Sequence, residues 1–186
     1  MKRPNEIADL VRRLLVHIGE DPDRQGLRET PRRFMEMLKS LTEGYRQDPK
    51  ELIAGAIFPV EYDQMIVVKD ILFYSLCEHH ILPFFGKAHV GYIPNGRVIG
   101  MSKIPQIVEH FSKKLQLQEN LTDEIADFLM ETLAPKGVGV VIEGFHLCMA
   151  MRELQKDAWL MTSAVKGIFR RDPRTRAEFM QLIGRR

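Results

Sequence analysis

The chain has 186 residues, of which 45% are hydrophobic, and its formal net charge is +2 at pH 7. This length is sufficient for one domain with a hydrophobic core, and the near-neutral charge argues against a general affinity for nucleic acid or membrane surfaces. No apolar run approaches the roughly 20 residues that span a bilayer. Charged residues interrupt the apolar residues near the N-terminus, so we expect no signal peptide and a cytoplasmic protein.

The first 45 residues have the pattern of two helices. Apolar residues recur at helical spacing between residues 5 and 18, and Thr30 followed by Pro31 predicts the N-cap and first position of a second helix. The two helices are expected to form a hairpin that packs on the main body or on another subunit. We therefore predict an N-terminal helical segment over 1–50 and a main catalytic domain over 51–186.

From residue 57 the pattern changes to β-branched and aromatic runs that are typical of strands, beginning with MIVVKDILFYSL. The turn Pro94-Asn95-Gly96, between KAHVGYI and RVIGM, predicts a β-hairpin. Ser102 and Thr122 predict the N-caps of two amphipathic helices. Further strands are expected at VVIE, HLCMAMRE and WLMTSAVKG, and Pro173 opens a last helix. This order predicts an α+β fold with an antiparallel sheet, because strands and helices do not alternate as in βαβ units.

Two short motifs, CEHH (Cys77 to His80) and HLC (His146 to Cys148), contain the only cysteines of the chain. In a reducing cytosol, cysteines near histidines favour metal binding or catalysis over a disulfide, although two buried inert thiols are an ordinary alternative. Cys77 and His80 are spaced to reach one ion from a turn, and His146 and Cys148 would share one face of a strand. Two thiolates and one imidazole suit zinc.

Two interpretations of this zinc site stay open. A structural site would be closed by a fourth ligand, for which His79 or His146 is available. A catalytic site would hold a water molecule and lower its pKa toward about 7. In that case His79 and His146 would be surplus histidines beside the metal, suited to carrying protons. The surplus histidines favour the catalytic interpretation.

The segment SLCEHHILPFFGKAHVGYIPNGRVIGMSK, with LQLQENLTDEIA and EGFHLCMAMR, closely resembles the zinc-dependent GTP cyclohydrolase I family. GEDPDRQGLRETPRRF and TRAEFMQLI extend the resemblance over most of the chain from about residue 18. The resemblance implies a T-fold, with antiparallel β-hairpins and two long helices on one face, and a homodecamer of two pentamers. It implies hydrolysis of GTP to 7,8-dihydroneopterin triphosphate and formate by zinc-activated water at purine carbon-8, the first step toward tetrahydrofolate or pterin cofactors.

The resemblance also assigns roles to individual residues. The residues that match the zinc ligands are Cys77, His80 and Cys148, and those that match the acid/base pair are His79 and His146. The residues that match the guanine-recognising segment are Gln118 and Glu119. The residues that match triphosphate contacts are Ser102, Lys103, Arg152 and, from a neighbouring subunit, Arg33. Each polar residue of the last two groups could by itself be an ordinary surface residue.

The chain departs from the family pattern where the polyphosphate should lie. Gln106 stands where the family usually has an arginine, so one fixed positive charge is lost. Glu153 replaces a glycine beside Arg152, and Asp157 and Trp159 alter the hairpin. We therefore expect weaker GTP binding than is typical, or a preference for a less phosphorylated guanine nucleotide.

Two other functions stay open. One is a paralogous T-fold zinc hydrolase that acts on a related purine or pterin or stops at the ring-opened formamide. The other is a non-enzymatic binding or regulatory assembly in which zinc is structural.

Overall fold

The computed structural model describes residues 4–151 and 158–184. Contacts along the chain divide it into two compact units, residues 1–43 and residues 44–186. The predicted domain boundary at residue 50 stays a prediction. No helix in the described part of the chain combines the length and apolarity needed to cross a membrane.

The first unit contains two helices, α1 (Pro4–His17) and α2 (Thr30–Leu41). They pack against one another, as the helical-hairpin prediction requires, and Val11 and Leu15 of α1 are buried. The N-cap of α2 is Glu29 and not Thr30, so that prediction was wrong by one residue. The reason is that the Glu29 carbonyl already accepts a bond from the backbone N–H of Arg33 at 3.0 Å, which makes Thr30 the first helical residue.

The second unit is built around a five-stranded sheet in the order β5-β2-β3-β6-β7. Its strands are β2 (Ile66–Cys77), β3 (Pro83–Ile93), β5 (Leu115–Gln116), β6 (Gly137–His146) and β7 (Trp159–Gly167). All neighbours are antiparallel except β2 and β5, which are parallel. Two short helical segments, η1 (Glu43–Tyr45) and α3 (Pro49–Leu52), precede the sheet.

A separate two-stranded pair joins β1 (Ile57–Pro59) to β4 (Arg97–Ile99). The hairpin predicted across Pro94-Asn95-Gly96 was therefore wrong, although a turn with Gly96 at φ +77° is present. The strand before the turn, β3, already pairs with β2 on one side and with β6 on the other, as far as Ile93. Neither edge of β3 is available to β4 at this point, so β4 pairs with β1.

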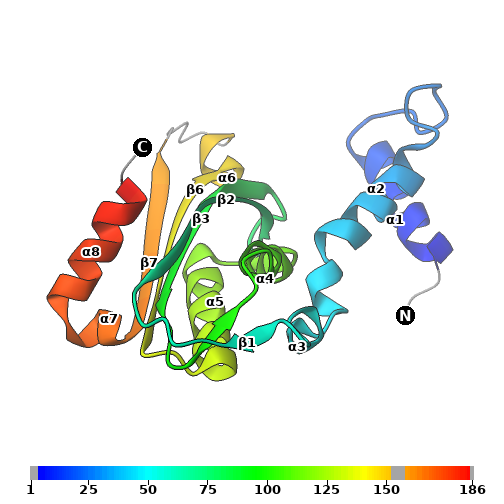
Figure 1. Cartoon of the computed structure of the whole chain (residues 1–186). Helices are drawn as coiled ribbons and strands as arrows, with labels where there is room; N and C mark the ends of the chain where they lie inside the picture. Colours follow the sequence, from blue (N-terminus) through cyan, green and yellow to red (C-terminus); the bar gives the residue numbers. More distant parts are fainter. Residues whose placement is uncertain (1–3, 152–157, 185–186) are drawn as a thin grey trace. The chain divides into compact units, whose positions relative to one another are not determined.

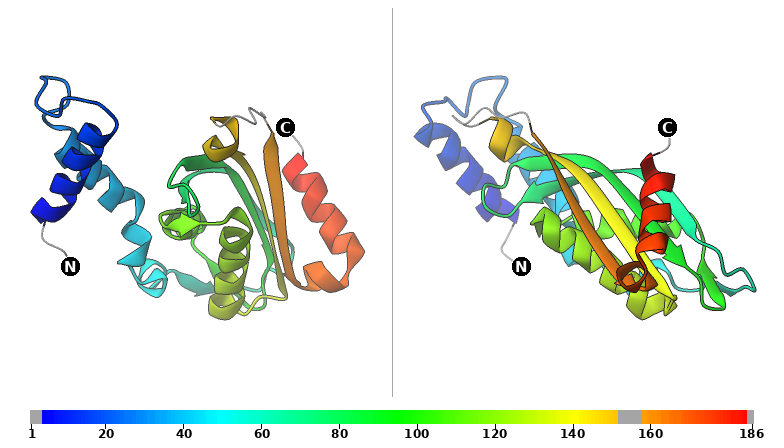
Figure 2. Two further views of the ribbon diagram at one scale, coloured as in Figure 1. Left: turned by 180° about the vertical axis from the view of Figure 1, so that it is seen from behind. Right: turned by 90° about the vertical axis from the view of Figure 1, so that its left-hand side faces the viewer.

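Helices cover both faces of the sheet (Figures 1 and 2). One face carries α4 (Lys103–Ser112) and α5 (Gln118–Leu133), and the other carries α7 (Ile168–Arg171) and α8 (Pro173–Gly184). Each face of the sheet has its own hydrophobic core, and successive side chains of β6 point alternately into the two. Val140 and Ile142 belong to the main core, whereas Val141 packs with Phe169 and Phe179. The predicted α+β T-fold, with antiparallel strands and two helices on one face, is confirmed.

Two local predictions about secondary structure were wrong. Helix α5 begins at Gln118, and Thr122 lies inside it, with its hydroxyl donating to the Gln118 carbonyl at 2.6 Å. A hydroxyl can bond the carbonyl one turn back as readily as it caps a helix, so the residue type alone did not locate the start. Strand β6 runs without interruption to His146 and the short helix α6 (Leu147–Ala150) follows it, so the strand predicted at HLCMAMRE is absent from the described residues 147–151.

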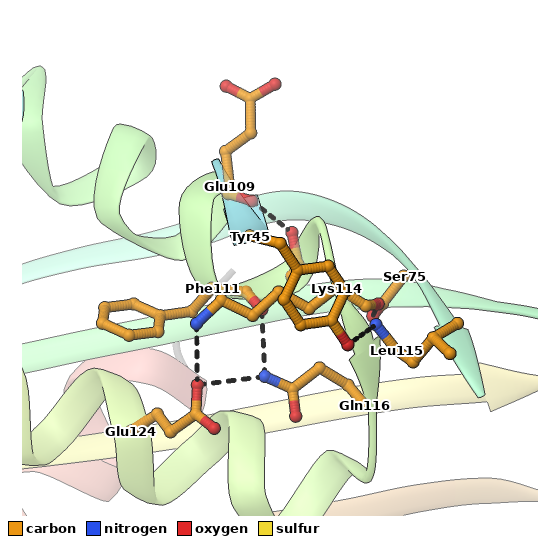
Figure 3. Close-up of polar contacts among 9 residues, drawn as sticks. Tyr45, Ser75, Glu109, Phe111, Lys114, Leu115, Gln116 and Glu124 are labelled. Atoms are coloured by element: carbon orange, nitrogen blue, oxygen red, sulfur yellow. Dashed lines mark hydrogen bonds and ion pairs between the residues drawn. The ribbon is translucent and has the colours of Figure 1, made fainter. Parts of the chain in front are cut away.

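The connection between α4 and α5 is held by a polar clamp, shown in Figure 3. The Gln116 amide donates to the Phe111 carbonyl at 3.0 Å and to the Glu124 carboxylate at 3.1 Å. The backbone N–H of Leu115 donates to the Tyr45 hydroxyl at 3.1 Å. These bonds tie Gln116 of β5 to both helices and Leu115 of β5 to η1. They hold α5 beside the end of β2, where β5 pairs.

Candidate metal centre and active site

Several chain segments converge at one end of the sheet. Cys77 is the last residue of β2, and its partner in the parallel strand is Gln116, two residues before α5 begins. Across the sheet, Phe84 near the start of β3 is in register with His146 at the end of β6. The pairing therefore brings CEHH, HLC and the start of α5 to the same end of the sheet, although they are far apart in sequence.

A tight turn directs His80 back toward Cys77. The backbone N–H of Cys77 donates to the Leu82 carbonyl at 2.9 Å, and the Ile81 N–H donates to the Cys77 carbonyl at 2.8 Å. Ile81 has φ +56°, in the left-handed region that a β-branched side chain rarely adopts. The turn holds this conformation against its local preference, which fixes the spacing of the first and last residues of CEHH.

Three potential ligands lie together at this end of the sheet. One nitrogen of His80 and the sulfurs of Cys77 and Cys148 are all within 4.8 Å of one another. The Cys77 Sγ is 3.9 Å from the His80 Nδ1. Ligands placed tetrahedrally around zinc lie about 3.6–3.8 Å apart, given bond lengths of about 2.0–2.3 Å. The group therefore fits such an ion after small side-chain movements. Among the described residues, no fourth His, Cys, Asp or Glu belongs to this group.

Cys148 reaches the metal group from a position that the sequence did not predict. It lies in the short helix α6 and not in a strand, so His146 and Cys148 do not share a strand face. His146 is the last residue of β6 and the N-cap of α6. The change from strand to helical turn between these two residues separates their environments: Cys148 joins the metal group, and His146 enters a buried polar network.

The His146 ring is buried at the core side of the sheet. It lies parallel to the Phe84 ring, with centroids 4.5 Å apart and an interplanar angle of 6°. Its Nε2 is 2.9 Å from the Gln118 Oε1. Burial lowers the pKa of His146, while the nearby carboxylate of Glu119 acts in the opposite direction. The neutral imidazole is therefore favoured, and a neutral imidazole can accept a proton.

His79 and Glu119 are exposed. The His79 Nε2 is 3.8 Å from the Glu78 carboxylate, and the His79 ring meets the His80 ring edge-on with centroids 6.2 Å apart. Glu119 is in the first turn of α5, directly after Gln118. Its negative charge acts to raise the pKa of His146. One histidine is thus open to solvent beside the metal group, and the other is enclosed.

The residues predicted to contact phosphate are only partly described. Ser102 is the N-cap of α4 without a side-chain cap bond, and the Lys103 ammonium donates to the Gln106 Oε1 at 3.1 Å. Arg33 is an exposed residue of α2 in the first unit. Arg152, with Glu153 and Asp157, lies outside the described residues. Trp159 is exposed and packs against Phe145 with centroids 5.6 Å apart.

Sequence reasoning missed three residues that support His146: Phe84, Gly144 and Thr162. Phe84 could have been found, because it follows CEHH at the start of an alternating strand. Gly144 and Thr162 carry no local signal, since their importance arises from contacts with Gln118 that depend on how α5 packs on the sheet.

Fold and site together define a class of α+β proteins with a Cys–His–Cys metal group at one end of the sheet and histidines beside it. The GTP cyclohydrolase I family model matches residues 7–184, and the chain belongs to this family of hydrolases.

Relatives named GTP cyclohydrolase 1 include proteins of a Synechococcus species, 56% identical over 93% of this chain and 76% of that protein, and of Deinococcus radiodurans, 52% identical over 97% and 84%. A relative of the same name from Coxiella burnetii is 49% identical over 96% of this chain and 98% of its own length. Among solved structures, the apo form of the archaeosine synthase QueF-Like matches with a TM-score of 0.46 and 18% identity, over 55% of this chain and 93% of that one.

Proposed function

We propose that this enzyme hydrolyses GTP to 7,8-dihydroneopterin triphosphate and formate, with the reaction centred on Cys77, His80, Cys148 and two adjacent histidines. The observation that carries the proposal is the three-membered ligand group, with His146 held outside it by a bond to Gln118. Three protein ligands with a further position for water are typical of catalytic zinc sites, whereas structural sites have four. Family membership supports the same reaction.

Zinc is the metal that we propose, because two thiolates and one imidazole form a soft donor set. When bound, zinc would supply a water molecule with a pKa lowered toward about 7, suited to hydrolysis at purine carbon-8. Addition of water across the bond between carbon-8 and nitrogen-7 also requires a proton on nitrogen-7, and nitrogen-9 must take a proton when its bond to carbon-8 breaks and the ring opens. His79, which is exposed, can take protons from solvent, and His146, whose pKa burial lowers, can accept them within the site.

For substrate recognition we propose that the carboxylate of Glu119 accepts hydrogens from the amide and amino groups of guanine. Adenine lacks that paired donor edge, and leaving a polar group unpaired is costly. Gln118 belongs to the same segment. Ser102, Lys103, Arg152 and Arg33 of a neighbouring subunit are the proposed triphosphate contacts. The exposed position of Ser102 at the start of α4 supports this role.

We also propose that the chain acts as a homodecamer of two pentamers, as the family resemblance implies. Strand β7 supports an oligomer, because in the described sheet its outer edge has no partner strand. Exposed strand edges favour pairing with another chain. Metal binding needs reduced, deprotonated thiols, and neither Cys77 nor Cys148 forms a disulfide, which supports a cytoplasmic location. Mass photometry of the purified protein tests the oligomer.

The decisive experiment is mass spectrometry of the products formed from GTP by the zinc-loaded protein. Dihydroneopterin triphosphate with formate is the expected result. A ring-opened formamide as the only product would limit the activity to the first hydrolysis, and unchanged GTP would overturn the proposal.

The variant His146→Ala separates a catalytic from a ligand role. It should retain nearly all of its zinc, measured by elemental analysis, and lose product formation. Loss of zinc would indicate instead that His146 is a fourth ligand and that the site is closed. His110→Ala, which removes another buried histidine that does not belong to the metal group, is the control for general damage to the fold.

A further inference from the structure

Gln118 is among the most deeply buried polar side chains of the described residues, with 1% of its surface exposed. Its Nε2 lies 3.0 Å from the Ile142 carbonyl, 3.0 Å from the Leu160 carbonyl and 3.1 Å from the Thr162 hydroxyl. Its Oε1 lies 2.9 Å from the His146 Nε2. Both ends of the amide are therefore engaged inside the protein.

These contacts leave only one orientation for the amide. Two of the three partners at the nitrogen end are backbone carbonyls, which can only accept hydrogen bonds. Exchanging the amide oxygen and nitrogen would place an acceptor against both carbonyls and leave a buried NH₂ group facing His146. Leaving buried polar groups without partners costs about 1–3 kcal/mol each, so the orientation with oxygen toward His146 is enforced.

The hydroxyls around Gln118 support the same orientation. Thr122 donates its hydrogen to the Gln118 backbone carbonyl at 2.6 Å, so its oxygen is left to accept from Thr162, 2.7 Å away. The Thr162 oxygen in turn accepts from the Gln118 amide. The two amide hydrogens share three acceptors and both hydroxyl hydrogens have a partner, and such a satisfied buried network is rigid.

We infer that Gln118 is a positioning residue, which holds the His146 imidazole in the tautomer that has its hydrogen on Nε2 and its lone pair on Nδ1. The Gln118 oxygen can only accept a bond, so the His146 Nε2 must donate. The second ring nitrogen of the neutral imidazole then carries the lone pair. This inference rests on the proposed role of His146 in proton transfer.

Two neighbours, Gly144 and Phe84, restrict the positions of Gln118 and His146 through packing. A methyl group on Gly144 would lie 2.1 Å from the Gln118 Oε1 and 3.5 Å from the His146 Nε2, so only glycine leaves room for the bond. On the other side, the parallel Phe84 ring prevents the imidazole from rotating out of line. The ring is thus fixed in both position and tautomer.

A direct side-chain contact between Gln118 and guanine is the competing role. Such a contact would break bonds that already satisfy the amide. Glu119, the next residue, is exposed and needs no such rearrangement. The two roles differ in kinetics: a substrate contact acts on KM, whereas a positioned proton carrier acts on kcat.

Steady-state kinetics of Gln118→Met with GTP, on the full-length zinc-loaded protein, separates these roles. Methionine is close to glutamine in size but offers no amide. We expect kcat to fall about 10- to 100-fold, as for residues that orient catalytic groups, with KM changed less than about threefold. The matched control is Gln116→Met, which removes another buried amide that does not touch His146; its kcat should fall by less than about threefold.

Solid-state nitrogen NMR of isotope-labelled histidines provides a readout that packing damage alone would not move. The His146 signals are assigned by their loss in His146→Ala, at a pH about one unit above 6.5, where imidazole is neutral. The wild type should show a single tautomer protonated at Nε2, and Gln118→Met a mixture of both. If Gln118→Met does not fold, Gly144→Ala tests the same bond, because the added methyl group displaces the Gln118 Oε1 from its position beside His146.

The outcomes are distinct. A raised KM with unchanged kcat, or an unchanged tautomer in a folded variant, overturns the inference while leaving the proposed function intact. Equal losses of kcat in Gln118→Met and Gln116→Met also overturn it, because the effect would then be general. Wild-type protein that leaves GTP unchanged would instead refute the proposed function.

Discussion

The substitution Gly144→Ala should damage both the stability of the fold and catalysis, because the added methyl group has no room. It would lie 2.1 Å from the Gln118 Oε1 and 3.1 Å from the Gln118 Cδ, where ordinary contacts begin at 3.4 Å. The amide must therefore move by more than about 1 Å, which breaks its bond to His146 or its bonds to the Ile142 and Leu160 carbonyls. Overpacking costs about 1–3 kcal/mol and an unpaired buried amide about 1–3 kcal/mol, so we expect a loss of about 2–6 kcal/mol.

Urea unfolding at one fixed protein concentration measures the stability, and product formation from GTP measures kcat. The control is Gly139→Ala in the same strand, where a methyl group would meet the Phe169 and Phe179 rings at 2.8 and 3.0 Å. It should destabilise by about 1–3 kcal/mol through overpacking yet leave kcat within about threefold. If Gly144→Ala unfolds at the wild-type urea concentration and keeps its kcat, the network has no such rigidity and the reasoning fails.

Three further predictions concern the metal, the polyphosphate and pH. Cys148→Ala should reduce bound zinc, measured by elemental analysis after dialysis, to a small fraction of the wild-type content; wild-type content would remove Cys148 from the ligand set. Gln106→Arg should lower the KM for GTP about 3- to 10-fold while leaving that for GMP nearly unchanged, because it restores a charge beside Lys103; equal changes for GTP, GDP and GMP would refute a triphosphate site there. Burial lowers the pKa of His110, so below about pH 6.5 the unfolded chain binds a proton that the folded chain resists. The urea midpoint should therefore fall on acidification through that range, and less so in His110→Gln; equal falls in both proteins would exclude His110 as a cause.

Local sequence patterns were sufficient for the elements whose signals are carried by neighbouring residues. The helical spacing near the N-terminus, the β-branched and aromatic run over 65–76 and the helix opened by Pro173 all agree with the structure. The failures have different causes. Thr122 is a good N-cap by type, but its hydroxyl bonds the carbonyl one turn back inside α5. Pro94-Asn95-Gly96 is a good hairpin turn by type, but β2 and β6 already pair with β3, so β4 joins β1.

The sequence by itself determined the chemistry of the metal group. Cys77, His80 and Cys148 are donors by residue type, and their motifs are specific enough to indicate the family. Only the tertiary structure decided what surrounds His146. Gln118 is 28 residues from His146 and 42 from Leu160, and these groups meet only when α5 packs on β6 and β7. A hydrogen bond depends on distance and direction in space, which residue types do not encode locally, so the tautomer of a buried histidine follows from the packed fold.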